Sequence, residues 1–533
     1  MNGIAAIAER DAPERARTLV AALRSPACYP HPVGEVEVMQ THISYVVLAG
    51  EFAYKIKKPV RFAFLDFAGL EARRFYCEEE LRLNRRTAPS LYLDVVPIGG
   101  THAAPIVGGD GPAIEYAVRM RRFAQGDLLD RRAAEGRLRP ADIDALAASV
   151  ARFHAQAARA RRGAPFGTPE LLLAQALDNF TALEGLEREP GTRDILRQLR
   201  EWTCREHAAR LAQLENRRTE GFVRECHGDL HLGNVVLVDG TPAPFDCIEF
   251  DARLRTIDVM SDVAFTVMDL HRLEMPRLAA RFLDAYLQET GDYGGLGLLR
   301  FYCVYRALVR AKIAGLRAYQ VDIDEGERVR ALERLRRHVV LARRLSGRGI
   351  ARLILMHGLS GSGKTFVASQ LLETLGAIRL RSDVERKRLH GVAPLGVSAS
   401  ALGGGIYSQE ANLGTYERIA ALAHGAIADG YPVIVDATFL EREQRAAFRA
   451  LAERARVPFA IVACEAPEAV LRERLAIRAR GGRDASEADA AVLALQLEHR
   501  DPLGSEERAH AIVIDTTLPD PAGEAHRALL RRL

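Results

Sequence analysis

A glycine-rich segment in the C-terminal half of the chain has the residue types needed to hold a nucleotide phosphate. In LILMHGLSGSGKTFVASQLL, Gly358 is followed by four residues and then by Gly363, Lys364 and Thr365. Glycines let backbone N–H groups curl around an anion, the lysine reaches the terminal phosphates, and the threonine hydroxyl ligates magnesium. The spacing therefore predicts a Walker A loop for ATP and Mg²⁺. Its predicted nucleotide-binding residues are Gly358, Ser360, Gly361, Ser362, Gly363, Lys364 and Thr365.

A second polar cluster lies in the N-terminal half, in CHGDLHLGNVVLVDG, residues 226–240. Asp229 is followed by four residues and then by Asn234, which is the spacing of the kinase catalytic loop H-R-D-x-x-x-x-N. In such a loop the aspartate accepts the proton of the attacking hydroxyl, and the asparagine holds a magnesium ion. Asp246, seventeen residues after Asp229, is predicted to hold a second magnesium. The ordered set predicts a site that converges on metal-bound ATP.

The segment HGDLHLGN has a glycine, Gly228, where the kinase loop has an arginine. It resembles the aminoglycoside phosphotransferase and choline kinase family, whose motif is H-G-D-x-H-x-x-N. The resemblance covers roughly residues 35–320. It implies a protein-kinase-like fold, and it makes His227 and His231 supports of the loop and not metal ligands.

The same resemblance implies a phosphate-binding lysine on the third strand and a glutamate on the following helix. In FAYKIKKPV, residues 52–60, Lys55 and Lys57 lie on one face of the expected strand, with Lys55 the better candidate and Lys57 the alternative. In CEEEL, the inward helical face favours Glu80 over Glu79 as the partner of the lysine. No G-x-G-x-x-G loop precedes the lysine strand, which fits the aminoglycoside branch better than the protein kinases.

Acidic and basic residues also follow the glycine-rich loop. Asp383 and Asp436 each stand at the end of an apolar run, and Arg474 and Arg478 lie four apart on one predicted helix face. The pattern resembles the small P-loop kinases, which include gluconate kinase, zeta toxin and the kinase domain of polynucleotide kinase. That resemblance implies that Asp383 is the catalytic base or a substrate-positioning acid, that Arg386 contacts the acceptor, and that Asp436 is a magnesium or acceptor-side acid. It also implies that Arg474 and Arg478 form a lid over the phosphates.

Two of these interpretations have structural alternatives. Asp383 precedes VERKRL and has the residue type of a helix N-cap, a role that is compatible with catalysis. Arg474 and Arg478 lie in an arginine-rich chain, so a solvated helix face explains them as well.

The expected secondary structure gives these residues two different scaffolds. Strands are expected at 42–50, 52–60, 91–99 and 113–120, and helical segments at 70–88, 140–218 and 256–345. From residue 351 onward strands and helices alternate, which is typical of a parallel sheet. We therefore predict an α+β protein-kinase-like domain over residues 1–345, followed by an α/β P-loop domain with a parallel sheet over residues 350–533.

Composition limits the class of protein. The chain has 533 residues, of which 48% are hydrophobic and 27% charged, and a formal net charge of +4, so charge alone does not imply a nucleic-acid partner. Only six of its 74 basic residues are lysines, and two of these six, Lys55 and Lys364, fall at predicted phosphate sites. The seven cysteines form no C-x-x-C pair, and no apolar run reaches membrane-spanning length. We expect reduced thiols, a cytoplasmic location and no membrane contact.

Together the motifs predict a two-module enzyme that uses ATP and Mg²⁺ to phosphorylate a hydroxyl of a small metabolite in each module. The basic residues Arg306, Arg310 and Arg317 favour an anionic acceptor over a polycationic aminoglycoside, unless they form a solvated helix face. Two other functions stay open. One module could sense nucleotide and regulate the other, or the protein could be a nucleic-acid-end kinase, against which the balanced charge weighs.

Overall fold

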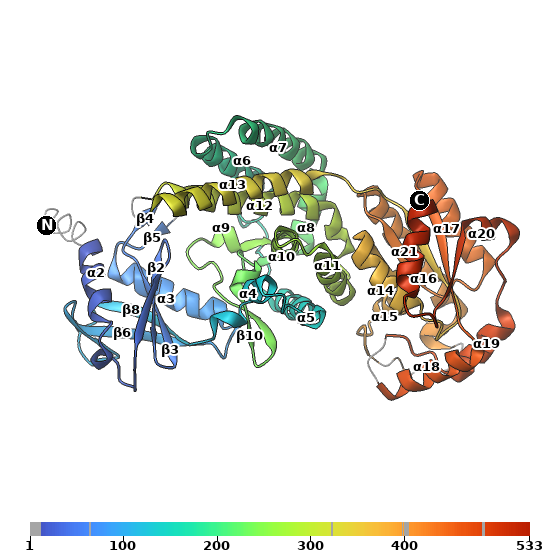
Figure 1. Cartoon of the computed structure of the whole chain (residues 1–533), viewed down its shortest axis with the longest axis horizontal. Helices are drawn as coiled ribbons and strands as arrows, with labels where there is room; N and C mark the ends of the chain where they lie inside the picture. Colours follow the sequence, from blue (N-terminus) through green and yellow to red (C-terminus); the bar gives the residue numbers. More distant parts are fainter. Residues whose placement is uncertain are drawn as a thin grey trace. The chain divides into compact units, whose positions relative to one another are not determined.

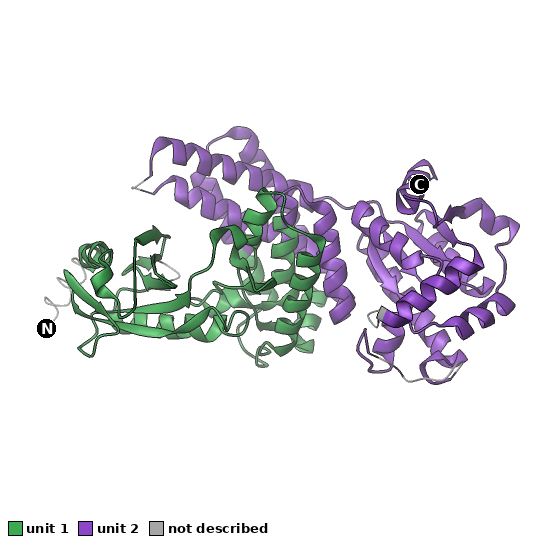
Figure 2. Ribbon diagram, turned by 60° about the horizontal axis from the view of Figure 1, so that its bottom comes forward, with its two compact units in different colours: residues 1–175, 211–269 green, residues 176–210, 270–533 purple. Residues whose placement is uncertain are grey.

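The computed structural model describes residues 12–62, 65–320, 323–396, 398, 404–481 and 485–532. Contacts divide the chain into two compact units, residues 1–175 with 211–269 and residues 176–210 with 270–533 (Figure 2). This division follows packing, and the domain boundary near residues 345–350 stays a prediction. Within the described residues no helix is both long enough and apolar enough to cross a membrane. The cytoplasmic location also stays a prediction.

An antiparallel sheet of six strands begins the first unit (Figure 1). Its order is β1 (Val36–Gln40), β2 (Ser44–Ala49), β3 (Phe52–Lys57), β8 (Glu115–Arg121), β6 (Tyr92–Thr101) and β7 (Ala104–Val107). The predicted hairpin is confirmed between β2 and β3, where Gly50 turns the chain with a φ of +59°. Strand β3, which carries the predicted lysine, therefore lies inside the sheet, between β2 and β8.

Both faces of this sheet are apolar, and the lysines of β3 lie on one of them. Tyr54 and Ile56 point to the face that packs with Leu19 of α2 (Ala12–Ala22). The opposite face packs with Cys77 of α3 (Leu70–Asn84). Because side chains alternate along a strand, Lys55 joins the α3 side, where helix residues can reach it.

The rest of the first unit is made of helices and short strand pairs. The helices are α4 (Leu129–Ala134), α5 (Pro140–Gln156), α6 (Pro169–Leu186, which continues into the second unit), α8 (Leu211–Glu220), α9 (Ala252–Arg255) and α10 (Val259–Arg272). The strand pairs are β4 (Arg61–Phe62) with β5 (Leu65–Asp66), β9 (Val223–Glu225) with β12 (Thr256–Asp258), and β10 (Val235–Val238) with β11 (Thr241–Pro244). The prediction of helix for residues 256–258 is wrong, because their backbone pairs with β9.

The second unit contains four long helices ahead of its sheet: α7 (Pro190–Ala209), α11 (Pro276–Thr290), α12 (Leu296–Ala318) and α13 (Glu325–Ser346). The basic residues predicted to form a stripe lie on α12. Arg306 is only 4% exposed, and Arg317 pairs with Glu327 at 2.7 Å. The first is therefore buried and the second neutralised, so this set of arginines does not support an anionic acceptor.

A parallel sheet of five strands follows in the same unit, as predicted. Its order is β14 (Ile378–Arg381), β15 (Val433–Asp436), β13 (Leu353–His357), β16 (Phe459–Glu465) and β17 (Ala511–Asp515). The accompanying helices are α14 (Lys364–Leu375), α15 (Ser382–Leu389), α16 (Gln409–Ala428), α17 (Arg442–Ala455), α18 (Glu468–Gly481), α19 (Ala490–His499), α20 (Ser505–His510) and α21 (Pro521–Arg532). The predicted architecture, an α+β region with an antiparallel sheet followed by an α/β domain with a parallel sheet, is confirmed.

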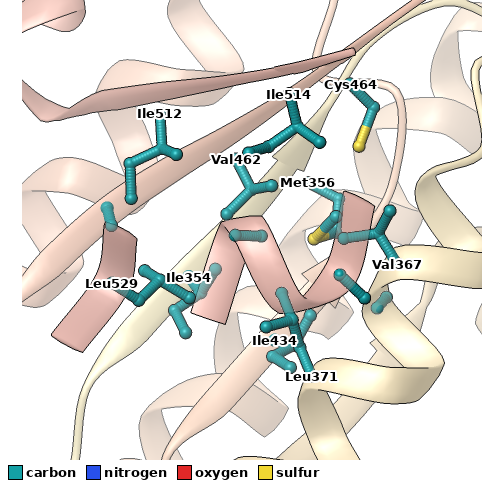
Figure 3. Close-up of a cluster of buried hydrophobic side chains, with 14 of the residues drawn as sticks. Ile354, Met356, Val367, Leu371, Ile434, Val462, Cys464, Ile512, Ile514 and Leu529 are labelled. Atoms are coloured by element: carbon teal, nitrogen blue, oxygen red, sulfur yellow. The ribbon is translucent and has the colours of Figure 1, made fainter. Parts of the chain in front are cut away.

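A buried apolar cluster fixes α14 against this sheet (Figure 3). Val367 and Leu371 stand four apart on α14 and face strand residues such as Ile434 and Val462. Leu529 of α21 packs into the same cluster. Because α14 begins directly after the glycine-rich loop, this cluster also holds the loop at the carboxyl end of β13.

Candidate active sites

In the first unit, Lys55 of β3 and Glu80 of α3 form a buried ion pair. Lys55 Nζ donates a hydrogen bond of 2.8 Å to Glu80 Oε1 and a second, shorter bond to Asp246 Oδ1. Three of the residues predicted for this site are thus brought together. Glu79 faces elsewhere, because its carboxylate pairs with Arg82 and Arg255 at 2.7 Å each.

Lys57 extends this pair into a chain of alternating charges. Its ammonium group is fully buried and bonds to Glu80 Oε2 and Glu249 Oε1. The charges run from Asp246 through Lys55, Glu80 and Lys57 to Glu249. Only the Asp246 end is open to solvent, with 42% of its side chain exposed. Lys57 therefore lies in the buried part of the network, while Lys55 lies next to its exposed Asp246 end.

The network keeps its central groups charged. Burial would raise the pKa of Glu80, but Lys55 and Lys57 outweigh burial and hold that pKa at about 2. Burial would lower the pKa of Lys55, but Asp246 and Glu80 raise it well above its usual value. An ammonium held between two carboxylates is thus present at neutral pH, as phosphate binding requires.

Helix α3 also anchors the segment that carries Asp246. One turn after Glu80, the Asn84 side chain accepts a 2.8 Å hydrogen bond from the backbone N–H of Cys247. Asp246 itself has a φ of +63°, a left-handed conformation that is uncommon outside glycine. Such a backbone persists only where its surroundings hold it, and here the Asp246 carboxylate is held by Lys55.

The segment 226–234 brings Asp229 and Asn234 together. Asn234 Nδ2 donates 3.0 Å hydrogen bonds to Asp229 Oδ2 and to the Asp229 carbonyl oxygen. Gly228 has a φ of +86°, and a Cβ there would lie 2.8 Å from the carbonyl oxygen of Leu254. Close backbone approach therefore explains why glycine replaces the arginine of the kinase loop.

His227 supports this loop from within. Its Nδ1 accepts a 3.3 Å bond from the Asp229 N–H, so the proton lies on Nε2, which donates to the Phe245 carbonyl oxygen at 2.9 Å. Burial lowers the pKa of His227 and keeps the ring neutral. His231 Nε2 lies 3.4 Å from Asp229 Oδ2. Both rings thus contact the loop that they were predicted to support.

Three polar residues of α10 hold the same loop, and the sequence analysis missed them. Asp262 accepts hydrogen bonds from the backbone N–H groups of His227 at 2.7 Å and Gly228 at 2.9 Å. Thr266 donates to the Leu230 carbonyl oxygen at 2.8 Å, and Asp269 accepts from the Leu232 N–H at 3.0 Å. A local signal existed. The three stand at i, i+4 and i+7 of an otherwise apolar helix, which is unusual for buried positions.

In the second unit, the glycine-rich loop connects β13 to α14 as predicted. Gly358 has a φ of +139°, and a Cβ there would lie 2.4 Å from the Cys464 carbonyl oxygen, so only glycine fits. Lys364 Nζ donates a 2.8 Å hydrogen bond to the Leu359 carbonyl oxygen within the loop. Burial lowers the pKa of Lys364 more than Asp436 raises it. Ser362 is buried in the same loop, and the Ser360 N–H donates to Gln496 Oε1 at 2.8 Å.

The two predicted acids lie at the carboxyl ends of neighbouring strands. Asp436 ends β15, and Asp383 follows β14 in the first turn of α15. Arg381 is the cap residue of α15, so the alternative that Asp383 caps this helix is wrong. Among the described residues no hydrogen-bond donor reaches the buried Asp436 Oδ2, and Arg381 Nε lies 3.7 Å from it. A carboxylate oxygen without a hydrogen-bond donor among these residues, close enough to Lys364 to affect its pKa, suits magnesium, which prefers oxygen ligands.

One of the two predicted lid arginines, Arg474, contacts the loop, and the other, Arg478, contacts the segment before α19 (Ala490–His499). Arg474 Nη1 donates to the Gly361 carbonyl oxygen at 3.3 Å and to Thr516 Oγ1 at 2.9 Å. Arg478 Nη2 donates to the Ala488 carbonyl oxygen at 2.5 Å. Both are half-buried, so a purely solvated helix face does not describe them. Their role as a lid stays a prediction.

Comparisons with known proteins also assign the two halves of the chain to two different families. The Phosphotransferase enzyme family matches residues 76–299, and the AAA domain family matches residues 353–503. Uncharacterized proteins of Mycobacterium tuberculosis and Mycobacterium bovis are each 32% identical over 474 residues, covering 88% of this chain and 92% of theirs. The predicted resemblances to the phosphotransferase and P-loop kinase groups are confirmed.

Solved structures are each similar to part of this chain. A gluconokinase from Sinorhizobium meliloti is 23% identical, covers 34% of this chain and 94% of its own, and gives a TM-score of 0.26. A choline/ethanolamine kinase family protein from Mesorhizobium loti is 14% identical, covers 62% of this chain and 99% of its own, and gives a TM-score of 0.36.

Proposed function

The chain belongs to the family of these mycobacterial relatives and carries a phosphotransferase domain followed by a P-loop kinase domain, and we propose that each domain is a separate, active kinase. The family matches make the protein an ATP-dependent phosphotransferase. We propose further that both sites use Mg²⁺ and that each phosphorylates a hydroxyl of a small metabolite. The observation that carries this proposal is that each site has its own lysine and its own carboxylate with room for a further ligand. The Asp246 side chain is 42% exposed, and Asp436 Oδ2 accepts no hydrogen bond from the described residues.

At the N-terminal site, Asp229 takes the proton of the acceptor hydroxyl. The hydroxyl oxygen bonds to the γ-phosphorus as the bond from that phosphorus to the ADP oxygen breaks. Asn234 orients Asp229 through its 3.0 Å hydrogen bond, and Lys55 binds the phosphates while Glu80 holds the lysine in position. Asn234 and Asp246 are the residues that would hold Mg²⁺, which when bound neutralises the charge of the triphosphate.

At the C-terminal site, Asp383 takes the acceptor proton in the same way. The backbone N–H groups of the glycine-rich loop and Lys364 bind the phosphates, and Lys364 exchanges its bond to the Leu359 carbonyl for bonds to phosphate oxygens. Thr365 and Asp436 are the residues that would hold Mg²⁺. Arg474 and Arg478 lie on α18 beside the loop, in a position from which they could close over the phosphates.

The C-terminal acceptor is an anion in this proposal. Arg386 stands three residues after Asp383 on α15, so the two side chains share a helix face. Arg386 is 9% exposed, and its Nε has no hydrogen-bond partner within the described part of the chain. A buried guanidinium with an open donor is costly unless a ligand completes it, and a carboxylate or phosphate of the acceptor fits that donor.

The proposal is tested by phosphoryl transfer from γ-labelled ATP to a metabolite extract. The full chain is compared with Lys55→Ala and Lys364→Ala, and with Lys312→Ala as a lysine control outside both sites. We expect two classes of labelled product, one lost in each site variant and both kept in the control. A single class, or loss of both classes in one variant, would mean that only one site transfers phosphate.

The magnesium assignment has its own test. Asp246→Asn removes a charge from the half-exposed end of the network without removing bulk. We expect weaker magnesium-dependent ATP binding at the N-terminal site with the fold kept, as judged by circular dichroism. An unchanged magnesium dependence would remove the main support for Asp246 as a ligand.

A further inference from the structure

A buried ion pair joins α11 to the edge strand of the parallel sheet in the second unit. Arg379 of β14 donates to Asp284 of α11 twice, from Nη2 to Oδ2 at 2.7 Å and from Nε to Oδ1 at 3.3 Å. The two side chains are 9% and 8% exposed. Burial would lower the pKa of Arg379, but Asp284 outweighs burial and raises it. A two-point contact of this kind fixes the plane of the guanidinium.

The same guanidinium reaches Ser369, which lies one turn after Thr365 in the helix that follows the glycine-rich loop. Arg379 Nη1 donates to Ser369 Oγ at 2.6 Å, and Ser369 Oγ donates to the Thr365 carbonyl oxygen at 2.7 Å. Thr365 is the proposed magnesium ligand. An unbroken series of hydrogen bonds therefore runs from Asp284 through Arg379 and Ser369 to Thr365.

Helix α11 also holds the backbone of β14. Gln288 Nε2 donates to the Arg379 carbonyl oxygen at 3.0 Å, and Arg388 Nη2 of α15 donates to the Gln288 carbonyl oxygen at 2.5 Å. Residues 379–388 contain the strand end and the helix turn that carry Asp383. Helix α11, which lies within the segment matched by the phosphotransferase family, thus contacts both β14 and α14, the elements that carry Arg379 and Thr365.

We propose that Asp284 is a positioning residue of the P-loop site and that α11 is a working part of the C-terminal kinase. This inference rests on the proposed nucleotide- and magnesium-binding role of that site. Asp284 neutralises Arg379 and sets its plane, and Arg379 then fixes Thr365 through Ser369. Without the carboxylate, the buried guanidinium is uncompensated and must turn toward water or another acceptor. The Thr365 turn then loses its support, and the magnesium-binding geometry loosens.

The test is the magnesium requirement for nucleotide binding by the full chain. Asp284→Asn keeps the shape of the side chain and removes its charge. Binding of a fluorescent ADP analogue is titrated with Mg²⁺ in a background that carries Asp246→Asn, so that the P-loop site dominates the signal. We expect the Mg²⁺ midpoint to rise about 10-fold or more, the size of effect seen when the partner of a metal ligand is removed. Amide hydrogen exchange in residues 364–369 and 378–383 should speed up in parallel.

Arg281→Gln is the matched control, because Arg281 of α11 pairs with Glu373 of α14 at 2.7 Å in the same contact without leading to Thr365. We expect its Mg²⁺ midpoint to stay unchanged. Ser369→Ala breaks the series without exposing a buried charge, and it decides the question if Asp284→Asn does not fold. A wild-type midpoint in Asp284→Asn or, failing that, in Ser369→Ala overturns the inference. Absence of magnesium-dependent binding in the unaltered P-loop site would instead overturn the proposed function.

Discussion

The lysines of the two sites are held in opposite ways. Lys55 lies between two carboxylates, which raise its pKa, and belongs to a chain of five buried or half-buried charges. Lys364 donates to a backbone carbonyl oxygen, and burial lowers its pKa. The first site therefore positions its cation by side-chain charges from distant segments. The second does so by the backbone of one continuous loop.

This difference determines what each site tolerates. A network of side chains depends on every member, because removing one partner leaves another charge buried and unpaired. A backbone cradle depends on glycines and on the helix behind it, and a single lysine can be removed without exposing a partner. Substitutions in the N-terminal network should therefore lower both activity and folding stability, whereas removing the lysine of the C-terminal site should lower activity with little loss of stability.

The largest effect is expected at the two catalytic acids. Asp229→Asn and Asp383→Asn each remove the group that accepts the acceptor proton, which typically costs about 10²- to 10⁴-fold in rate with much less change in ATP affinity. Steady-state rates with the identified acceptors are the measurement. Each variant should lose one transfer and keep the other.

Two results would count against this assignment. Full transfer by a domain whose aspartate is changed would mean that the base lies elsewhere. A variant that still binds ATP in its own domain but alters the rate of the other domain would favour a nucleotide-sensing switch.

Removing Lys364 should come next in size. Lys364→Ala is expected to lower turnover by the C-terminal site about 10²- to 10³-fold, the scale for loss of one charge-stabilising group. The free energy of unfolding should change by less than about 1 kcal/mol, because Lys364 donates its hydrogen bond to a backbone carbonyl oxygen and not to a carboxylate. Turnover and urea unfolding on the same sample measure both. A large loss of stability would contradict the view that the loop backbone, not an ion pair, holds this lysine.

Lys57 provides the opposite test in the N-terminal site. Lys57→Met leaves Glu249 and one oxygen of Glu80 without their cation, which should cost about 3–5 kcal/mol of unfolding free energy. The double change Lys57→Met with Glu249→Gln should recover part of that loss, since the unpaired charge is gone. Urea unfolding measures both variants, with Lys58→Met, the lysine directly after the strand, as the control. No recovery in the double variant would mean that packing, not charge, explains the loss.

Lowering the pH should destabilise the region around the C-terminal site before the N-terminal site, with a smaller effect than the substitutions above. Burial, reinforced by Arg445 and Lys364, lowers the pKa of His357 from 6.5 to about 4, so the unfolded chain binds its proton first and stability is lost as pH falls from 6.5 toward 4. The pKa of Glu80 is lowered from 4.5 to about 2, so its contribution is present above 4.5 and is lost only as pH falls toward 2. At pH 5 only the first change has begun.

Hydrogen exchange at pH 7.5 and pH 5 measures this separation. Residues 353–357 should lose protection at pH 5, while residues 52–57 should keep theirs. His357→Asn, whose amide can replace the Nδ1 donor to the Phe439 carbonyl oxygen, should reduce the loss. Equal losses in both strands would contradict the assignment.

Local patterns in the sequence predicted much of both sites. The glycine-rich loop and the spacing of Asp229 to Asn234 lie within single segments, so a motif of eight residues or fewer contains their chemistry. Strand alternation was enough to put Lys55 and Lys57 on one face. Helical periodicity was enough to favour Glu80, the glutamate that the structure pairs with Lys55.

The parts that escaped prediction are pairings between distant segments. Glu249 meets Lys57 across 192 positions, and Asp284 meets Arg379 across 95. Each of these residues looks ordinary in its own segment, and only tertiary packing decides its partner. The prediction from the basic residues of α12 failed for the same reason, because tertiary packing buries Arg306 and pairs Arg317 with Glu327.

Binding stoichiometry tests the central claim, that the chain holds two independent nucleotide sites, most directly. Isothermal titration of the full chain with a non-hydrolysable ATP analogue and Mg²⁺ should give two molecules bound per chain. Lys364→Ala and Lys55→Ala should each give one, with the remaining site keeping its wild-type affinity within about twofold, since distant sites are additive. One molecule per wild-type chain, or none in the Lys364→Ala chain, would contradict the account.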